Sequence, residues 1–453
     1  MAEKKNYRLL DRENPRDAAL VILLRVCEEH KKSHHAVREV LDQCGTMSKR
    51  DRAFAKRTAE GSLDYLIRID TLIGRYLKKP LFLLKPVIRN ILRMSFYQLL
   101  YMDKVPDSAV CNEAVELAKL HGLSALSGFV NGVLRAAVRD KLQGAERLFV
   151  IKDEAADLSV PKWLYKKLIA DLGRERAAEV MKSYLSERSV TVRLNRSLAS
   201  VREVEDSLSE DGIAFSRIDT AAFLSAHGVP YTEETLPVMY ELPGITGLSK
   251  VRAFQNGYLQ PQDVSAAIPA VLAAPEKGDR VIDVCAAPGG KSLQLADLLQ
   301  GSGEVEARDV SPQKTALIEE NIVRCGFQNI RTRVQDALKM DEDSLFRADI
   351  VIADLPCSGL GIAARKPDIK MNVKPYSITE LQGLQREMLR VVTRYVKPRG
   401  RFVYSTCTIT PEENGDNAEF IRTELGFTLL KETAVLPSAS CDGFYAALFE
   451  KTY

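Results

Sequence analysis

The feature that most constrains the fold is the regular alternation of strand-like and helix-like segments from residue 275 to residue 453. The strand-like runs "VIDV" and "DIVIAD" are almost entirely apolar, as strands covered by helices on both faces must be. Such alternation predicts an α/β domain with a doubly wound, Rossmann-like sheet and right-handed crossovers. The expected strands are "DRVIDVC" (279–285), "GEVEARD" (303–309), "NIRTRVQD" (329–336), "ADIVIADL" (348–355) and "GRFVYST" (400–406).

A glycine pair follows the first of these strands, in the stretch "DVCAAPGGKS" (283–292). Gly289 and Gly290 allow the backbone to turn sharply and to approach a ligand closely. The stretch is neither a Walker loop nor the G-x-G-x-x-G of dinucleotide enzymes. A ligand without phosphate groups needs no strong anion cradle. The loop therefore suits S-adenosylmethionine better than NAD.

Acidic residues end the next three strands: Asp309, Asp336 and Asp354. Ligands of doubly wound folds bind outside the carboxyl ends of the strands. Asp309 lies 20 residues after Gly289, a spacing at which a carboxylate can reach a ribose diol. Any one of these acids could be a turn residue or a helix cap. All three at one edge of a sheet indicate a cofactor site.

Two cysteines follow the fourth and fifth strands, Cys357 in "ADLPCSGLG" (353–361) and Cys407 in "RFVYSTCTIT" (401–410). Taken alone, a cysteine at a strand end is more often a buried structural residue. Amino-group methyltransferases commonly carry an aromatic ring where this chain has Cys357. A thiol there suggests covalent attack on carbon 6 of a pyrimidine, which lets carbon 5 take a methyl group. Asp354 could then hydrogen-bond the edge of the base.

The first 150 residues differ in charge from the rest of the chain. They hold 27 Lys and Arg against 18 Asp and Glu, whereas the remainder holds 37 against 43. Apolar residues recur there at spacings of three and four, which predicts an all-helical bundle. The positive excess suggests a polyanionic partner. Solvated helix faces are the alternative.

The middle of the chain is predicted to be a small α+β module. It contains the β-branched run "SVTVRLN", a helical "SVREVEDSLSEDG", and strand candidates at "IAFSRI" and "AAFLSAHG". We therefore divide the chain into an N-terminal helical domain (1–145), a linker helix with the α+β module (146–250) and the C-terminal α/β domain (251–453). In the last of these, Thr410 and Glu413 have the spacing of a capping box at the start of a helix.

Several classes of protein are disfavoured. The eight cysteines form no C-x-x-C pair, so we expect no metal site. Residues 1–17 lack the apolar core of a signal peptide, and no apolar run approaches the roughly 18 residues of a membrane helix. We expect a cytoplasmic protein without a membrane partner, in which thiols stay reduced.

Taken together, these motifs resemble the RNA cytosine-5 methyltransferase family, and most of all its Sun/RsmB branch, which modifies small-subunit ribosomal RNA. The N-terminal runs "ALVILLRV" and "FVNGVLR" resemble the NusB-like domain fused to this branch. Leu355 stands where the family often has Ala, and Met371 where it often has Trp. The matching stretches are "NGYLQPQDVSA" (256–266), "DVCAAPGGKS", "DVSPQK", "VQDA", "DLPCSGLG", "RKPDIK" (365–370), "YSTCT" and "DGFYAALFEK".

The resemblance implies transfer of a methyl group from S-adenosylmethionine to carbon 5 of a specific cytosine in 16S ribosomal RNA. Cys407 would be the nucleophile, Cys357 would aid product release, and Asp354 would contact both base and cofactor. Asp309 would bind the ribose and Asp336 would lie near the adenine. The implied residues of the cofactor loop are Cys285, Ala286, Ala287, Pro288, Gly289, Gly290 and Lys291.

The implied partner is small-subunit ribosomal RNA, and we expect it to be bound before the subunit is fully assembled and by a monomer. The sequence leaves open whether the substrate is naked RNA or an assembling subunit, and it leaves the oligomeric state open. Residues 1–145 and 146–250 would dock the RNA. DNA cytosine methyltransferases attack from the position of Cys357 instead, so the roles of the two thiols need a test.

Overall fold

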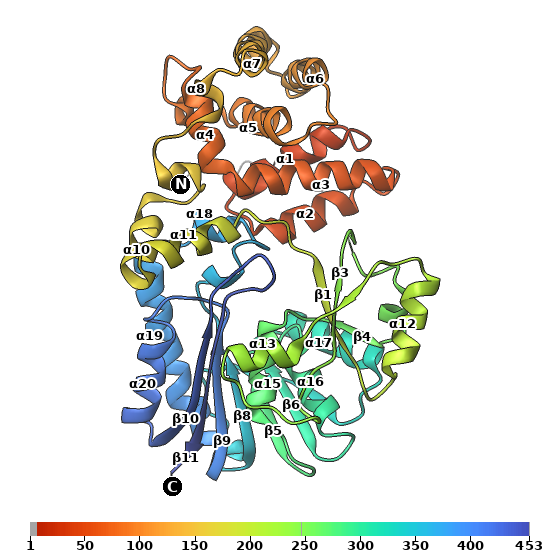
Figure 1. Ribbon diagram of the computed structural model, residues 1–453, viewed down its shortest axis with the longest axis vertical. Coiled ribbons are helices and arrows are strands. Elements are labelled where there is room, and N and C mark those ends of the chain that lie inside the picture. The colour runs from red at the N-terminus through yellow and green to blue at the C-terminus, as the bar shows by residue number, and fades with distance from the viewer. Residues whose placement is uncertain (1–6, 246, 453) are drawn as a thin grey trace. The chain divides into compact units, whose positions relative to one another are not determined.

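The computed structural model describes residues 7–245 and 247–452, which form two compact units (Figure 1). The first unit contains the described residues up to Ser186 together with Ala363–Asn372. The second contains Glu187–Ile362 and the chain from Val373 onwards. The chain thus leaves the second unit after Ile362, adds a short segment to the first, and returns.

The first unit is helical, as expected. Helix α1 (Pro15–Cys27) begins where the Asn14 side chain accepts hydrogen bonds from the amides of Arg16 and Asp17. It is buried along most of its length within the apolar core of the unit. The other elements are α2 (Ser33–Asp42), α3 (Lys49–Asp64), α4 (Leu66–Gly74), η1 (Leu81–Leu83), α5 (Pro86–Tyr101), α6 (Asp107–Leu120), η2 (Ser124–Leu126), α7 (Ser127–Leu142), α8 (Glu146–Phe149), α9 (Glu154–Asp157), α10 (Lys162–Leu172) and α11 (Arg174–Ser183).

The inserted segment carries the "RKPDIK" motif and the short helix α18 (Asp368–Asn372), which includes Met371. Lys370 is fully buried, and its Nζ donates a 2.9 Å hydrogen bond to the backbone carbonyl of Asp64 on α3. Burial lowers the pKa of Lys370 to about 8 and raises that of the Asp64 carboxyl to about 7. The motif is therefore part of the packing of the helical unit.

The second unit is built around a seven-stranded sheet with the order β10-β11-β9-β8-β5-β6-β7. Strands β5 to β9 are parallel, and β10 and β11 form an antiparallel edge. Helices α15 to α17 pack on one face, and α19 and α20 pack on the other (Figure 1). The expected doubly wound fold is confirmed.

The elements of this part are α15 (Ile268–Ala273), β5 (Arg280–Val284), α16 (Gly290–Leu298), β6 (Glu304–Asp309), α17 (Pro312–Cys325), β7 (Ile330–Val334), η4 (Glu342–Ser344), β8 (Ala348–Asp354), η5 (Leu360–Ile362), α19 (Pro375–Val392), η6 (Thr393–Tyr395), β9 (Val396–Thr406), α20 (Gly415–Glu424), β10 (Phe427–Val435) and β11 (Phe444–Lys451).

A smaller antiparallel sheet with the order β2-β3-β1-β4 forms the α+β module. Buried Arg193 on β1 joins it to the large sheet, because its guanidinium lies 3.1 Å from the carboxylate of Asp297 on α16. The elements are β1 (Val190–Leu194), α12 (Val201–Glu210), β2 (Ser216–Arg217), α13 (Thr220–Ala226), β3 (Met239–Leu242), α14 (Arg252–Gln255), β4 (Leu259–Pro261) and η3 (Ser265–Ala267).

Two local predictions are wrong. The stretch "AAFLSAHG" is helix α13 rather than a strand, because the Asp219 side chain accepts a 2.9 Å hydrogen bond from the amide of Ala222 and caps it. Thr410 and Glu413 do not form a capping box, since α20 begins only at Gly415. Thr410 Oγ1 instead donates a 2.8 Å hydrogen bond to the Glu413 carboxylate.

No helix within residues 7–245 or 247–452 combines the length and apolarity that a membrane crossing requires. Across the same residues, His, Cys, Asp and Glu side chains nowhere gather in a group of three or more that could hold a metal ion.

Candidate active site

The two predicted thiols lie side by side at the carboxyl edge of the large sheet. Cys357 follows β8 and Cys407 follows β9, and their sulfur atoms are 3.3 Å apart. The strands are parallel neighbours in a register that places Asp354 opposite Ser405. Cys357 lies three residues after Asp354 and Cys407 two residues after Ser405, so both thiols reach the same point. Both cysteines are unbridged and half-buried.

Hydrogen bonds fix the two thiol loops to one another. The hydroxyls of Ser358 and Thr408 are 2.7 Å apart, and the amide of Gly361 donates a 3.0 Å hydrogen bond to the carbonyl of Cys407. Gly361 must lack a side chain, because a Cβ there would lie 2.2 Å from the carbonyl oxygen of Gly443. The separation of the thiols is therefore set by a rigid pair of loops.

Glu413 connects the two thiol loops through hydrogen bonds to its carboxylate. Its fully buried carboxylate accepts hydrogen bonds from the amide (2.8 Å) and hydroxyl (2.5 Å) of Ser358 and from Gln385 Nε2 (3.1 Å). Thr410 supplies the fourth donor. One carboxylate thus anchors the residue after Cys357 to the loop after β9. From the sequence, Glu413 was predicted only as part of a helix cap.

The two thiols have different electrostatic surroundings. The pKa of Cys357 is raised well above 9 by its hydrogen bond with Cys407, by burial, and by the charges of Glu413 and Asp354. The raised pKa of the Lys291 ammonium has Asp354, Asp283 and Cys407 among its causes. The arrangement therefore favours a neutral Cys357 and places a cation within electrostatic reach of Cys407.

Asp354 is placed between the thiols and the glycine-rich loop. Its carboxylate accepts a 2.7 Å hydrogen bond from Lys291 Nζ and a 2.9 Å hydrogen bond from Ser405 Oγ. Burial alone would lower the pKa of Lys291, but the pKa is raised because Asp354, with smaller contributions from Asp283 and Cys407, outweighs burial. Lys291 also lies 5.2 Å from the centre of the Phe444 ring, a cation–π contact from β11. The two charges therefore hold one another in place.

A cavity of about 160 Å³ lies between the glycine-rich loop and β4. Its wall includes Asp283, whose fully buried Oδ2 accepts a 2.5 Å hydrogen bond from Ser292 and whose buried Oδ1 has no partner among the described residues. Burial raises the pKa of Asp283 to about 7 and that of Cys285 to about 12. The full lining is Gln260, Pro261, Gln262, Ala266, Asp283, Cys285, Ala286, Ala287, Pro288, Gly290, Lys291 and Asp354.

The remaining predicted cofactor residues lie outside this lining. Gly289 forms the turn at φ 104°, where a Cβ would approach the Ile318 side chain at 3.1 Å. Asp309 is buried and accepts hydrogen bonds from the amides of Ala287 (3.0 Å) and Val310 (2.7 Å), so it braces the loop. Asp336 accepts a 3.0 Å hydrogen bond from the amide of Leu338.

Asp283, Gln260 in β4 and Gln262 directly after it were not singled out from the sequence, although all three lie inside quoted motifs. Gln262 accepts a 2.7 Å hydrogen bond from Arg193 and donates one of 2.8 Å to Gln294. The available signal was the polar run "QPQD" directly before a helix. Nothing in one sequence shows that this run returns to cover the glycine-rich loop.

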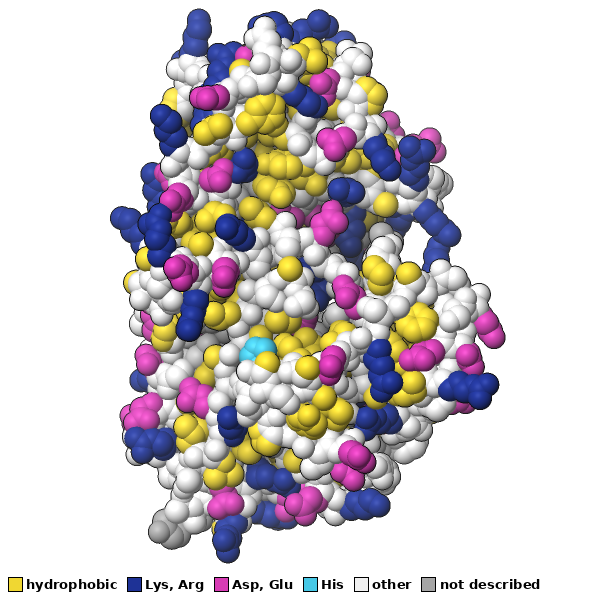
Figure 2. All heavy atoms as spheres, viewed as in Figure 1, with side chains coloured by type: hydrophobic (Ala, Val, Ile, Leu, Met, Phe, Trp, Pro, Cys, Tyr) yellow, Lys and Arg dark blue, Asp and Glu magenta, His cyan; other side chains and the backbone are white. Residues whose placement is uncertain are grey.

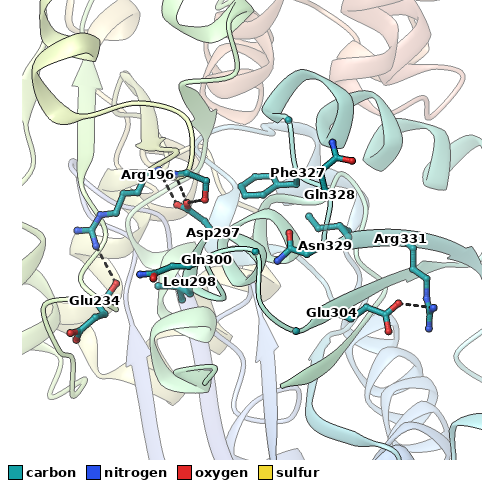
Figure 3. A pocket seen from close by; sticks show the side chains of 15 residues that line it. Arg196, Glu234, Asp297, Leu298, Gln300, Glu304, Phe327, Gln328, Asn329 and Arg331 are labelled. Carbon is teal, nitrogen blue, oxygen red and sulfur yellow. Dashed lines mark hydrogen bonds and ion pairs between the residues drawn. The ribbon is translucent and has the colours of Figure 1, made fainter. Parts of the chain in front are cut away.

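A larger open cavity of about 830 Å³ lies at the opposite edge of the sheet, where β6 and β7 begin (Figure 3). Two of its acids are already paired with neighbouring side chains. Asp297 accepts hydrogen bonds from Ser197, and Glu304 lies 2.6 Å from Arg331 (Figure 3). It contains neither thiol and no residue of the glycine-rich loop. The candidate active site is therefore the edge that carries Cys357 and Cys407.

This sheet, with a glycine-rich loop after its first strand and two thiols at the same edge, defines a Rossmann-like methyltransferase. Residues 270–450 match the family described as 16S rRNA methyltransferase RsmB/F. Residues 13–139 match the NusB family, and residues 160–225 match the ferredoxin-like domain of RsmF/B-like methyltransferases.

The probable ribosomal RNA small subunit methyltransferase B of Bacillus subtilis (strain 168) is 32% identical over 406 residues, which are 88% of this chain and 86% of that protein. The chain belongs to the RsmB/F family of 16S ribosomal RNA methyltransferases, which confirms the predicted family and enzyme class.

Two solved structures share the fold. The one described as PH0851 has a TM-score of 0.78 at 24% identity and covers 99% of this chain and 100% of its own. NSun6 from Pyrococcus horikoshii with SFG has a TM-score of 0.56 at 22% identity, covering 65% of this chain and 98% of that one.

Proposed function

We propose that this enzyme transfers a methyl group from S-adenosylmethionine to carbon 5 of a cytosine in small-subunit ribosomal RNA. The observation that carries the proposal is the 3.3 Å separation of Cys357 and Cys407 at the ends of adjacent strands. Methylation of an amino group needs no thiol at either position, whereas carbon 5 is unreactive until a nucleophile adds at carbon 6. The relatives named small subunit methyltransferase B support the choice of RNA.

The residues around the 160 Å³ cavity suit S-adenosylmethionine. The buried Oδ1 of Asp283 lacks a partner among the described residues, and a cationic amino group would supply one. The loop from Cys285 to Lys291 forms the wall beside it, and Asp309 and Asp336 would bind the ribose and adenine farther along the edge. When bound, the cofactor supplies an electrophilic methyl group.

The side chains can then divide the chemistry between them. Cys407 as a thiolate, with Lys291 as its counter-ion, bonds to carbon 6 of a cytosine that has left its stack. Asp354 hydrogen-bonds the edge of the base and favours the electron-rich adduct. After carbon 5 has gained its methyl group, its proton passes to water and the electron pair of that bond restores the double bond between carbons 5 and 6. The bond between Cys407 and carbon 6 breaks at the same time, and its electron pair returns to sulfur as the thiolate. Cys357, 3.3 Å away, aids this release.

Docking of the RNA is proposed for residues 1–145 and 146–250, and transfer for residues 251–453. The positive excess of the first 150 residues supports the docking role. A truncation that lacks residues 1–140 should bind the RNA less tightly, and unchanged binding would contradict this part of the proposal.

The test is to map the transferred methyl group. Ribosomal RNA from a strain that lacks this protein is incubated with purified enzyme and methyl-labelled cofactor, and bisulfite sequencing then locates protected cytosines. One new protected cytosine in small-subunit RNA supports the proposal. Label on an exocyclic nitrogen would instead establish an amine methyltransferase, and no incorporation into any RNA would favour an RNA-binding protein without activity.

A further inference from the structure

The segment that joins α4 to α5, residues 74–85, combines unpaired cations with an exposed aromatic ring. We call it the 74–85 loop. No carboxylate occurs between Asp70 and Asp103, although six Lys and Arg residues do. Two of the six are neutralised, since Arg89 lies 2.6 Å from Glu28 and Arg93 lies 2.7 Å from Asp70. The other four, all exposed, are Arg75, Lys78, Lys79 and Lys85.

The three lysines have no counter-ion within residues 7–245 or 247–452. Arg75 donates a hydrogen bond only to a backbone carbonyl, that of Arg147. Unpaired like charges on one short segment repel each other, and a polyanion relieves this repulsion. Elsewhere on the unit, Lys119 and Lys162 lie 2.7 Å from Glu116 and 2.9 Å from Asp153. The 74–85 loop thus differs from these parts of the surface, where a lysine is paired with a carboxylate.

Phe82 and Leu83 are 73% and 61% exposed at the tip of the loop. Figure 2 shows exposed apolar side chains together with Lys, Arg, Asp and Glu on one face of the helical unit. A single exposed apolar residue is common on protein surfaces and would carry no argument alone. What matters here is that the ring lies within four residues of three lysines that have no counter-ion among the described residues.

The ring is also held outward by a rigid turn. Leu81 and Leu84 pack against the core, and their 3-10 turn is closed by a 3.1 Å hydrogen bond from the amide of Leu84 to the carbonyl of Leu81. Arg89 Nη1 donates to the carbonyls of Phe82 (3.0 Å) and Leu84 (3.3 Å) while it pairs with half-buried Glu28. A backbone that is already fixed in this way loses little entropy on binding.

Single-stranded RNA offers both phosphates, which the lysines can bind, and exposed base faces, on which the ring can stack. A duplex hides the faces of its bases, and an acidic protein offers charge without stacking partners. We propose that the 74–85 loop binds a single-stranded stretch of the substrate RNA, with Lys78, Lys79 and Lys85 on phosphates and Phe82 stacked on a base. This inference rests on the proposed function, because it names the part of the RNA that the helical unit contacts.

The experiment measures binding of the full chain to a labelled, unstructured RNA of about 20 nucleotides, longer than the 4 to 16 that one binding module covers. A duplex of the same length is measured in parallel. Phe82→Leu should weaken single-strand binding roughly tenfold and leave the duplex unchanged, because base–aromatic stacking is lost. Phe82→Tyr should restore it. Lys78→Gln/Lys79→Gln/Lys85→Gln should lower the salt slope by about 2, since each single-strand phosphate contact contributes about 0.7.

The matched controls are Lys119→Gln/Lys162→Gln, which removes two paired cations, and Leu142→Ala, which removes a 79% exposed apolar side chain. Neither should change affinity or salt slope. Equal binding by Phe82→Leu and the wild type overturns the stacking role. An unchanged slope in the triple variant overturns the phosphate contacts. Binding needs no methyl transfer, so an enzyme that binds RNA through the loop but methylates nothing would contradict only the proposed function.

Discussion

The sulfur atoms of Cys357 and Cys407 lie 3.3 Å apart, on loops that follow neighbouring parallel strands. At this distance one thiol can hydrogen-bond the other, which raises the pKa of Cys357. The surroundings differ as well, with Glu413 adding to the raised pKa of Cys357 and the Lys291 ammonium within electrostatic reach of Cys407. We therefore predict different roles for the two thiols.

Cys357→Ser should trap a covalent complex with ribosomal RNA. A serine at this position cannot aid release, so the bond between Cys407 and carbon 6 persists. The complex should survive denaturing electrophoresis after incubation with cofactor and labelled RNA. Cys407→Ser, in contrast, should give no complex and no transfer. A complex that forms only in Cys407→Ser would assign the attack to Cys357, as in the DNA enzymes.

Glu413 should control the ionisation of Cys357 as well as the position of the loop that carries this cysteine. Glu413→Gln keeps the shape, because its amide can still accept from the Ser358 amide and donate to the hydroxyls of Ser358 and Thr410. It removes the negative charge, so the pKa of Cys357 should fall. The measurement is the pH dependence of Cys357 alkylation, followed by mass spectrometry in a Cys407→Ser background.

Two companion variants separate charge from packing. Thr410→Val removes one hydrogen bond to Glu413 without changing charge, and the alkylation profile should stay where it is. Glu413→Ala leaves the buried donors of Ser358 unsatisfied, which should cost about 1–3 kcal/mol of unfolding free energy. Coincident alkylation profiles for Glu413→Gln and its parent would show that the carboxylate acts through packing alone.

Asp283→Asn should change how stability depends on pH. Burial raises the pKa of Asp283 from 3.8 to about 7. The native state therefore binds a proton that the unfolded state has already released, and the wild type loses stability as the pH rises from about 4 to 7. Asn has no such dependence. Its stability relative to the wild type should grow over this range by up to roughly 4 kcal/mol and then level off.

Urea unfolding at several pH values measures this difference. If the unfolding free energies of Asp283→Asn and the wild type differ by the same amount at pH 5 and pH 8, Asp283 is ionised in the native protein throughout this range. The same variant should bind S-adenosylmethionine more weakly, since the orphan Oδ1 is the proposed partner of the cofactor's amino group.

Gly361→Ala should move Cys407. The new methyl group would lie 2.2 Å from the carbonyl oxygen of Gly443 and 2.8 Å from that of Cys407, and neither backbone can yield without shifting a thiol loop. We expect a loss of transfer of about 100-fold or more, the scale that a 1 Å misplacement produces. Gly383→Ala is the matched control, because this exposed helical glycine has nothing within 4 Å. It should stabilise α19 by about 0.5–1 kcal/mol and leave transfer unchanged.

Much of the fold follows from local patterns. Apolar runs such as "VIDV" and "DIVIAD" can be stable only as strands buried on both faces, so alternation with helices was enough to predict the sheet. Because parallel strands place their carboxyl ends at one edge, the sequence could also predict that Asp354, Cys357 and Cys407 gather there. The boundaries 1–145, 146–250 and 251–453 remain a prediction.

Other features depend on the path of the chain through space. The structure decided that Glu413 anchors Ser358 rather than capping a helix, and that Lys370 is buried against Asp64 on a helix some 300 residues earlier. It decided that Asp309 braces the glycine-rich loop and that Asp283 keeps an unpartnered oxygen. The succession of strands and helices along the chain follows from local periodicity, whereas the partner of a buried polar group depends on which distant loop passes beside it.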